Sequence, residues 1–115
     1  MPTSDRAIKR GDIVVVPFPY SDQLAEKRRP ALVVSGNSFN TKSGYLWVVM
    51  ITSKVDAPAS DIVPLSHPKT GLSKPSVVRA AKLATIEASR VIRVAGKVEP
   101  KIMNAVKKAM DSILA

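Results

Sequence analysis

Apolar residues along the chain gather in short runs that polar and turn-forming residues separate. Runs of about four to eight β-branched and other apolar residues are typical of β-strands. Such runs occupy residues 12–16, 31–35, 45–51, 61–65 and 76–79, and polar and apolar positions alternate over 90–94. The sequence therefore predicts five or six short strands. Because the run that contains Trp47 is apolar at every position, we expect both of its faces to be covered.

Prolines, glycines and charged residues mark the connections between these runs. Residues 17–20 include two prolines, which lack a ladder donor, so we expect the first strand to end there. The polar stretch 21–29 predicts an exposed loop. Gly36 and the polar residues after it predict a turn over 36–38. We expect a mobile loop over 66–75, which is rich in proline and lysine, and a helical turn over 86–89.

The C-terminal part of the chain changes to a helical period. Pro100 suits the first position of a helix, where its missing N–H does no harm. Apolar residues then recur at helical spacing, at Ile102, Val106, Ala109, Met110 and Ile113. The pattern predicts a helix over 100–114 that lays its apolar side on the sheet. The 115 residues are thus expected to form one domain, 1–115, a mainly β fold in which a small curled antiparallel barrel carries a helical cover.

The charge balance indicates a polyanionic partner. The chain has 18 Lys and Arg against 9 Asp and Glu, a net charge of +9, which favours nucleic acid, an acidic protein or an anionic membrane as the partner. It has no cysteine, which excludes a disulfide scaffold, a thiol nucleophile and a thiolate metal site, and its single histidine excludes a His–His zinc pair. No apolar run approaches the roughly 20 residues of a membrane span, and no signal-peptide pattern opens the chain, so we expect a cytoplasmic protein.

Two stretches of the sequence resemble a known family. The first stretch has two parts on either side of a charged loop. Its residues 11–20 read Gly-Asp-Ile-Val-Val-Val-Pro-Phe-Pro-Tyr, and 27–35 read Lys-Arg-Arg-Pro-Ala-Leu-Val-Val-Ser. The second stretch is 71–79, Gly-Leu-Ser-Lys-Pro-Ser-Val-Val-Arg. Together they resemble the MazF/PemK toxins of bacterial type II toxin–antitoxin modules. The resemblance implies an SH3-like barrel, a homodimer, an acidic cognate antitoxin and an endoribonuclease that cuts single-stranded RNA without a metal or other cofactor.

The resemblance assigns the catalytic pair to Arg29 and Thr52. An arginine at this position suits the chemistry, because its guanidinium stays charged and matches phosphate with two hydrogen bonds. Pro30 biases Arg29 towards an extended backbone, which limits where its side chain can aim. The Thr52 hydroxyl can bond a phosphate oxygen or the RNA 2′-hydroxyl. Taken without the resemblance, an Arg before a Pro and a Thr at a strand end are more often ordinary loop and strand residues.

Further residues of the matched stretches are candidates for RNA binding. Basic side chains bind phosphates and an aromatic ring stacks on unpaired bases, so the candidates are Tyr20, Lys27, Arg28, Ser53, Ser76 and Arg79. Histidine is a common general base, but His67 lies in the expected loop, and we interpret it as a bystander. No metal ligands are expected.

The chain departs from the family pattern after Arg79. Many family members carry one residue, then Asp-Gln, and later an arginine before a threonine. Here Ala81, Lys82 and Ala84 replace the carboxylate, the glutamine and the arginine. Because the carboxylate is a natural proton acceptor, its loss leaves the general base unassigned.

Two other functions compete with the ribonuclease. CcdB-like toxins share this fold and poison gyrase through a tryptophan near the C-terminus, whereas Trp47 is the only tryptophan in this chain. A catalytically inactive RNA-binding barrel is favoured by the substitution at Ala81. Cleavage of RNA in the presence of EDTA separates these hypotheses.

Overall fold

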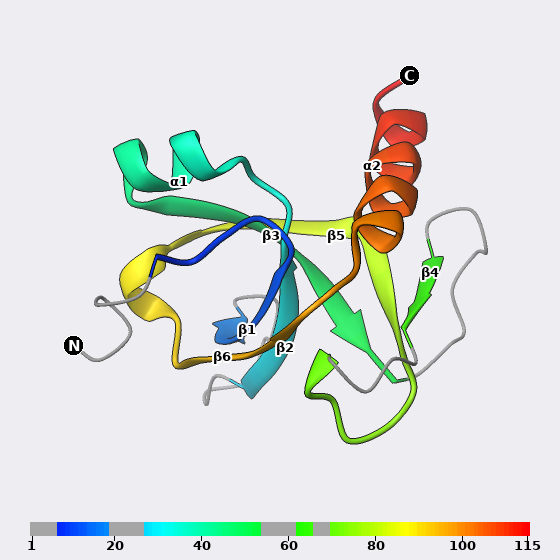
Figure 1. The fold of residues 1–115 in the computed structure, drawn as a ribbon, viewed down its shortest axis with the longest axis horizontal. Coiled ribbons are helices and arrows are strands. Elements are labelled where there is room, and N and C mark those ends of the chain that lie inside the picture. The colour runs from blue at the N-terminus through cyan, green and yellow to red at the C-terminus, as the bar shows by residue number, and fades with distance from the viewer. Residues whose placement is uncertain (1–6, 19–26, 54–61, 66–69) are drawn as a thin grey trace.

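A curled antiparallel sheet with a C-terminal helix forms the fold (Figure 1). The computed structural model describes residues 7–18, 27–53, 62–65 and 70–115. Within these residues the sheet has six strands in the order β4-β5-β3-β2-β1-β6. The elements in chain order are β1 (Asp12–Phe18), β2 (Lys27–Val33), α1 (Asn37–Ser43), β3 (Tyr45–Thr52), β4 (Ile62–Leu65), β5 (Ser76–Glu87), η4 (Ala88–Arg90), β6 (Arg93–Lys97) and α2 (Pro100–Leu114). The predicted fold class is confirmed.

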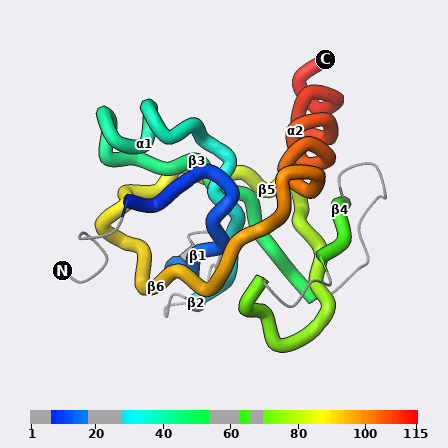
Figure 2. Tube along the Cα trace, viewed as in Figure 1, coloured from blue at the N-terminus to red at the C-terminus, as the bar shows by residue number. Residues whose placement is uncertain are grey.

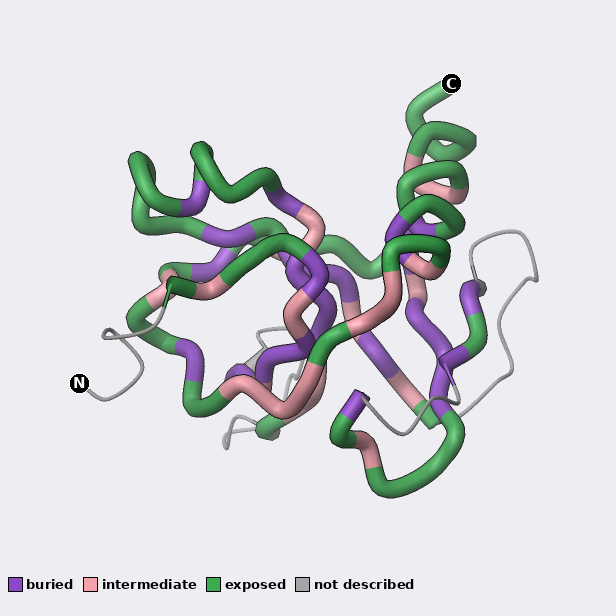
Figure 3. Tube along the Cα trace, viewed as in Figure 1, coloured by how far each residue is buried: buried purple, intermediate pink, exposed green. Residues whose placement is uncertain are grey.

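Each face of the sheet packs against its own apolar cluster. Successive residues of a strand point to opposite faces, so odd and even positions separate. The first cluster lies under α2 and contains Ile13, Leu32, Val49, Ile51, Val63, Leu65, Val78, Met103 and Val106. The second lies on the other face and contains Val14, Val16, Ala31, Val33, Leu46, Val48, Ile86 and Val91. Figure 3 shows these buried positions along the middle strands. We call the two sides the helix face and the open face.

Irregular pairing bends the sheet at two places. Between β3 and β5, Val49 pairs with Leu83 but the next residue of β3, Met50, pairs with Arg79. Residues 80–82 of β5 therefore have no partner on β3. On β6, the pairing with β1 shifts by one residue at Ala95. Because bulges increase local twist and bend a strand, these two irregularities curl the sheet into the partial barrel that the tube view shows (Figure 2).

A close backbone contact brings the two ends of the sheet together. Gly71, before β5, has a φ of 73°, and a Cβ atom there would overlap the carbonyl oxygen of Ala95 in the β6 bulge. Leu72 packs against the cluster under α2. Only glycine fits both this backbone conformation and this approach. The segment that was predicted as a mobile loop is therefore anchored at 70–72, while 66–69 lie outside the described residues.

The first strand continues past the point where proline was expected to end it. β1 includes Pro17, which pairs with Arg28. The carbonyl of Val15 accepts a hydrogen bond from the N–H of Ile92, so the polar groups of Val15, and of Pro17 two residues on, point away from β2. The described β1–β6 pairing ends at Val15. The missing N–H of Pro17 therefore removes no ladder bond, which is why the predicted strand end was wrong.

The second strand begins earlier than predicted. β2 spans Lys27–Val33 and not 31–35, so the last three residues of the predicted exposed loop are paired with β1. The hydrophobic pattern did not predict this start of the strand because Lys27, Arg28 and Arg29 are charged. They belong to the strand because they pair with β1. Residues 21–26 lie outside the described residues.

Other element boundaries also moved. The predicted turn at 36–38 is the start of α1, a short helix that Gly44 ends in the left-handed conformation. The strand predicted at 76–79 continues as β5 to Glu87, and the helical turn follows it as η4. The strand predicted over 90–94 is β6, displaced to Arg93–Lys97.

The C-terminal helix has the predicted bounds. α2 begins at Pro100, and its Val106 is fully buried between the helix and the sheet. Met103, which the predicted apolar stripe omitted, is also buried, whereas Ile113 of that stripe is half exposed. Among the described residues, neither helix is long and apolar enough to cross a membrane.

The expectation that both faces of the third strand are covered holds for its second half, where Val48, Val49 and Ile51 are buried, and fails at its start. There Tyr45 and Trp47 are 46% and 45% exposed on the helix face. Trp47 is therefore a surface residue and not a core residue.

Candidate functional site

Alternation along β2 and β3 places Arg29 and Thr52 on the same face of the sheet. The β2–β3 pairing ends with Ala31 facing Met50. Arg29 and Thr52 each stand two residues beyond this last pair, one on each strand. Residues two apart in a strand share a face, so both belong to the open face together with Ala31 and Met50. Arg29 and Thr52 are each half-buried at the rim of the second cluster.

Pro30 explains why the ladder stops beside these two residues. Val15, which faces Pro30 across β1 and β2, directs its carbonyl to Ile92 and so away from β2. When two facing residues of an antiparallel pair do not bond each other, each points its backbone N–H and C=O away from the partner strand. The backbone groups of Pro30 therefore point away from β1 and towards β3. Pro30 has no N–H to donate there. The described β2–β3 ladder therefore ends next to Arg29 and Thr52.

Arg79 lies on the same face, on the next strand. It pairs with Met50 of β3 and with Ile62 of β4, and its Nε atom is buried. Arg79 and Arg29 therefore flank β3 from its two sides, with Thr52 on the strand between them. Two strand spacings, about 10 Å, separate β2 from β5 where the three strands run side by side. This distance suits two cations that bind one extended polyanion.

The other predicted residues are distributed differently. Arg28 is exposed and, as the neighbour of Arg29 in a strand, belongs to the helix face. Ser76 also belongs to that face and is 9% exposed; its hydroxyl donates to the Lys74 carbonyl at 3.1 Å. The structure thus does not bring Ser76 to Arg29. Ser53 follows β3 and is exposed, and Lys27 begins β2. Tyr20 and His67 lie outside the described residues.

No described carboxylate neighbours this arrangement. Asp12 stands at the start of β1 and Glu87 at the end of β5, at the far ends of these strands from Arg29 and Arg79. The described residues also contain no group of three or more His, Cys, Asp or Glu side chains that could hold a metal ion. The described open-face rim is cationic, a character that suits phosphate groups.

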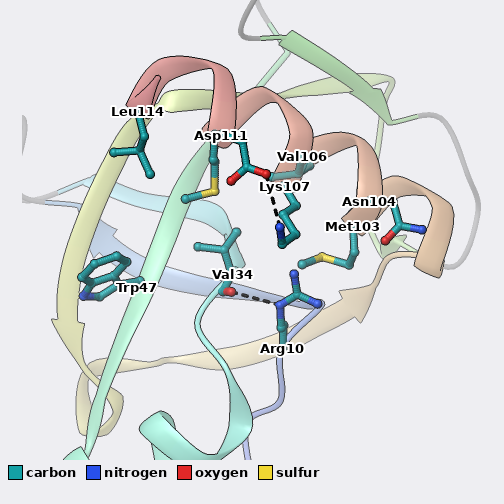
Figure 4. A pocket seen from close by; sticks show the side chains of 10 residues that line it. Arg10, Val34, Trp47, Met103, Asn104, Val106, Lys107, Asp111 and Leu114 are labelled. Carbon is teal, nitrogen blue, oxygen red and sulfur yellow. Dashed lines mark hydrogen bonds and ion pairs between the residues drawn. The ribbon is translucent and has the colours of Figure 1, made fainter.

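A groove on the helix face is a second feature, which sequence reasoning missed (Figure 4). It has a volume of about 530 Å³ and runs between α2 and the exposed ring of Trp47. Arg10 stands at its edge, where its Nε donates to the Val34 carbonyl at 3.1 Å. On the helix side, Lys107 and Asp111 form an ion pair at 3.2 Å. The lining residues are Arg10, Val34, Trp47, Met103, Asn104, Val106, Lys107, Met110, Asp111 and Leu114.

Helix α1 extends the apolar surface beside this groove. Phe39 meets Trp47 edge to face, with ring centroids 6.3 Å apart, and is itself 42% exposed. Asn40 is buried and fixes α1 to the sheet, because its side chain bonds both the hydroxyl and the carbonyl of Ser35. The Ser35 hydroxyl also accepts the N–H of Trp47 at 3.0 Å. The sequence reasoning missed this surface because it predicted a turn where α1 begins and a strand covered on both faces at Trp47.

The sequence and fold identify the family. A sequence profile of the PemK-like, MazF-like toxins of type II toxin–antitoxin systems matches residues 9–114. The chain belongs to this toxin family. No curated protein matches the MazF-like chain closely enough in sequence to add to this assignment.

Solved structures of MazF toxins share the fold of this MazF-like chain. MazF from Deinococcus radiodurans aligns with a TM-score of 0.79 at 22% identity, over 96% of this chain and 98% of that one. A MazE–MazF complex from the same organism aligns with a TM-score of 0.79 at 25% identity, over 96% and 97%. An endoribonuclease in complex with its cognate antitoxin from a mycobacterial species aligns with a TM-score of 0.77 at 22% identity, over 94% and 95%.

Proposed function

We propose that this MazF-like toxin is an endoribonuclease that cuts single-stranded RNA without a metal ion. The observation that carries the proposal is that Arg29 on β2, Thr52 on β3 and Arg79 on β5 all belong to the open face. These residues come from separate parts of the sequence. A rim of two guanidiniums and a hydroxyl, next to the end of the β2–β3 ladder, suits a phosphate group of RNA.

In the proposed reaction the RNA supplies its own nucleophile. The 2′-oxygen attacks the adjacent phosphorus and loses its proton, and the bond to the 5′-oxygen breaks as that oxygen gains a proton. The products are a 2′,3′-cyclic phosphate and a 5′-hydroxyl. Arg29 stabilises the charge that develops on the phosphoryl oxygens. Thr52 orients the 2′-hydroxyl or the phosphate by a hydrogen bond. Arg79 binds the adjoining part of the RNA backbone. Such a substrate is met in the cytoplasm.

Cleavage in EDTA tests this function. Purified protein should cut a fluorescent single-stranded RNA in excess EDTA, since no step uses a metal. Ala81 favours a second candidate, a barrel that binds RNA without cutting it, because the carboxylate of the family pattern is missing there. Binding of the RNA without cleavage would replace the first proposal by the second. Inhibition of gyrase without RNA cleavage would favour the CcdB-like alternative.

We also propose an acidic cognate antitoxin as partner of the open face. Structures similar to this chain include complexes with antitoxins. The net charge of +9 and the cationic rim around Arg29 and Arg79 suit an acidic segment as well as they suit RNA. Such a segment should compete with RNA, and both should bind more weakly as the salt concentration rises. Simultaneous binding of RNA and antitoxin would contradict a shared face.

A homodimer would bury the groove on the helix face. Trp47 and Leu114 line it, Phe39 contacts Trp47, and Tyr45 and Leu83 are further exposed apolar residues of the same face. The groove carries Arg10 and Lys107 but also Asp111, so a two-fold contact can bring opposite charges of the two copies together. Trp47→Asp should shift the protein to a monomer in light scattering. Ile92→Asp, at an exposed apolar residue before β6, is the control. A dimer that withstands Trp47→Asp would refute this surface.

A further inference from the structure

An apolar side chain lies between the two arginines of the open face. Met50 of β3 faces Ala31 of β2 on one side and Arg79 of β5 on the other. Residues that pair directly across antiparallel strands share a face, so all three belong to the same face of the sheet. That face is the open face, because Ala31 is a member of the second cluster and Met50 packs against that cluster. Met50 therefore stands beside Arg79 and two residues before Thr52 on β3.

The place of Arg29 on this face follows from pairing in the same way. Arg29 faces Val16 of β1, which is a fully buried member of the second cluster. Arg29 is thus on the open face of β2, and Arg79 is on the open face of β5, with β3 between the two strands. Thr52 and Met50 occupy the open face of that middle strand. Two cations therefore flank one hydroxyl and one thioether.

Met50 differs in exposure from the apolar residues next to it on this face. Ala31 and Val48 are fully buried, whereas Met50 is half-buried, as Arg29 and Thr52 are. Part of the Met50 side chain therefore reaches the surface at the rim. The thioether is uncharged and only a weak hydrogen-bond acceptor, so it does not serve a phosphate. It is polarizable and makes favourable contacts with aromatic rings, and in RNA the aromatic rings are the bases.

We infer that Met50 binds a base of the RNA: one unpaired base lies against its thioether while Arg29 and Arg79 bind the backbone on either side. The inference rests on the proposed function, in which these two arginines hold the RNA. Every base has an aromatic face, so the contact accepts all four bases. A purine has the larger ring system and gains more from the contact than a pyrimidine does. Met50 contributes affinity and takes no part in the chemical step.

Removal of single bases from the RNA tests this contact. The probe is a short single-stranded RNA of fixed sequence that the wild type binds, with 2′-O-methyl sugars throughout to prevent cleavage, and abasic nucleotides replace its bases one at a time. Met50→Ala should weaken binding of the intact RNA about two- to tenfold, the scale of one sulfur–aromatic contact. At one abasic position Met50→Ala and wild type should bind equally, because the base that contacts Met50 is missing there.

Two further measurements separate this role from a purely structural one. Met50→Leu keeps an apolar side chain of similar volume, so it should retain most of the affinity for the intact RNA. With RNA that can be cut, Met50→Ala should raise KM by the same factor as Kd and leave kcat within about twofold, as expected when the base is bound equally in substrate and transition state. A fall in kcat at unchanged KM would contradict a base-binding role.

Val94→Ala is the matched control. Val94 is also a half-buried apolar residue that packs against the second cluster, but it stands on β6, at the opposite end of the sheet order from β4 and β5. It should bind every RNA of the series as the wild type does. An equal loss of affinity by Met50→Ala for intact and all abasic RNAs, no loss for any of them, or the same loss in Val94→Ala would overturn the assignment and leave the ribonuclease in place. If the wild type neither binds nor cuts RNA, the proposed function fails and this assignment fails with it.

Discussion

Arg29 is the residue on which the proposed chemistry depends most. Removal of a group that stabilises developing charge typically costs about 2–4 kcal/mol of transition-state stabilisation. Arg29→Ala should therefore lower kcat about a hundredfold or more. Arg29→Lys should also be poor, because an ammonium cannot make the two-pronged contact of a guanidinium. The measurement is the rate of cleavage of a fluorescent RNA by folded variants.

Two further variants make that result specific. Thr52→Val keeps the shape and the strand preference of Thr52 and removes its hydroxyl, so it should also slow cleavage without loss of fold. Arg93→Ala removes an exposed arginine of β6 that faces Val15 on the helix face, and should cut at the wild-type rate. Normal cleavage by Arg29→Ala and Thr52→Val would show that the site lies elsewhere.

Gly71 is the residue on which closure of the sheet depends. Gly71→Ala places a methyl group against the Ala95 carbonyl and also forces a side chain into a positive φ. Gly44→Ala imposes the same backbone cost, about 1–2 kcal/mol, but has nothing within 4 Å of its new Cβ. Denaturant unfolding should therefore show a clearly larger loss of stability for Gly71→Ala. Equal losses would mean that the contact with β6 adjusts without cost.

At the scale of elements, α2 is held by a small buried stripe. Val106 is fully buried against the sheet, so Val106→Ala should lower the free energy of unfolding by about 2 kcal/mol, from lost apolar contact and the cavity left behind. Lys108→Ala, on the outer side of the helix, should change it by less than about 0.5 kcal/mol. Thermal unfolding followed by circular dichroism measures both. A negligible effect of Val106→Ala would contradict the view that α2 is part of the core.

The elements also differ in how much of them the sequence could predict. The bounds of α2 were predictable because one apolar period runs from Pro100 to its end. The start of β2 was not, because Arg28 and Arg29 are charged and only their pairing with β1 makes them part of a strand. Helix α1 was not predictable from pattern either. Its seven residues are mostly polar, and buried bonds of Asn40 to Ser35 hold it in place.

The candidate site shows the same division between what is local and what is not. Arg29 and Thr52 were predicted from local motifs that resemble the family. Local sequence could not show that they share a face, because that depends on how β2 and β3 pair. Ser76 was placed with them on the same grounds, but the alternation of β5 turns it to the other face. Trp47 was predicted to lie in a covered strand. Its exposure could not be predicted, because neither its neighbours in sequence nor its spacing shows how far α2 extends over the sheet.

At the scale of the whole molecule, one sheet separates two surfaces of different character. The open face carries Arg29, Thr52 and Arg79 at its rim, and the helix face carries the apolar groove beside Trp47. The separation matches the two kinds of partner that we propose, a polyanion on one face and a second copy of the chain on the other. The charge of +9 adds a long-range attraction for RNA and for an acidic antitoxin alike.

The central claim is that the protein cuts RNA by attack of the RNA's own 2′-hydroxyl on the adjacent phosphate. The most direct test compares a single-stranded RNA with the same strand carrying a 2′-deoxy sugar at the cleaved position, both in excess EDTA, with products analysed by mass spectrometry. The account predicts cleavage of the RNA to a 2′,3′-cyclic phosphate and a 5′-hydroxyl, and no cleavage at the 2′-deoxy position. Cleavage of both strands at that position, or of neither, would contradict it.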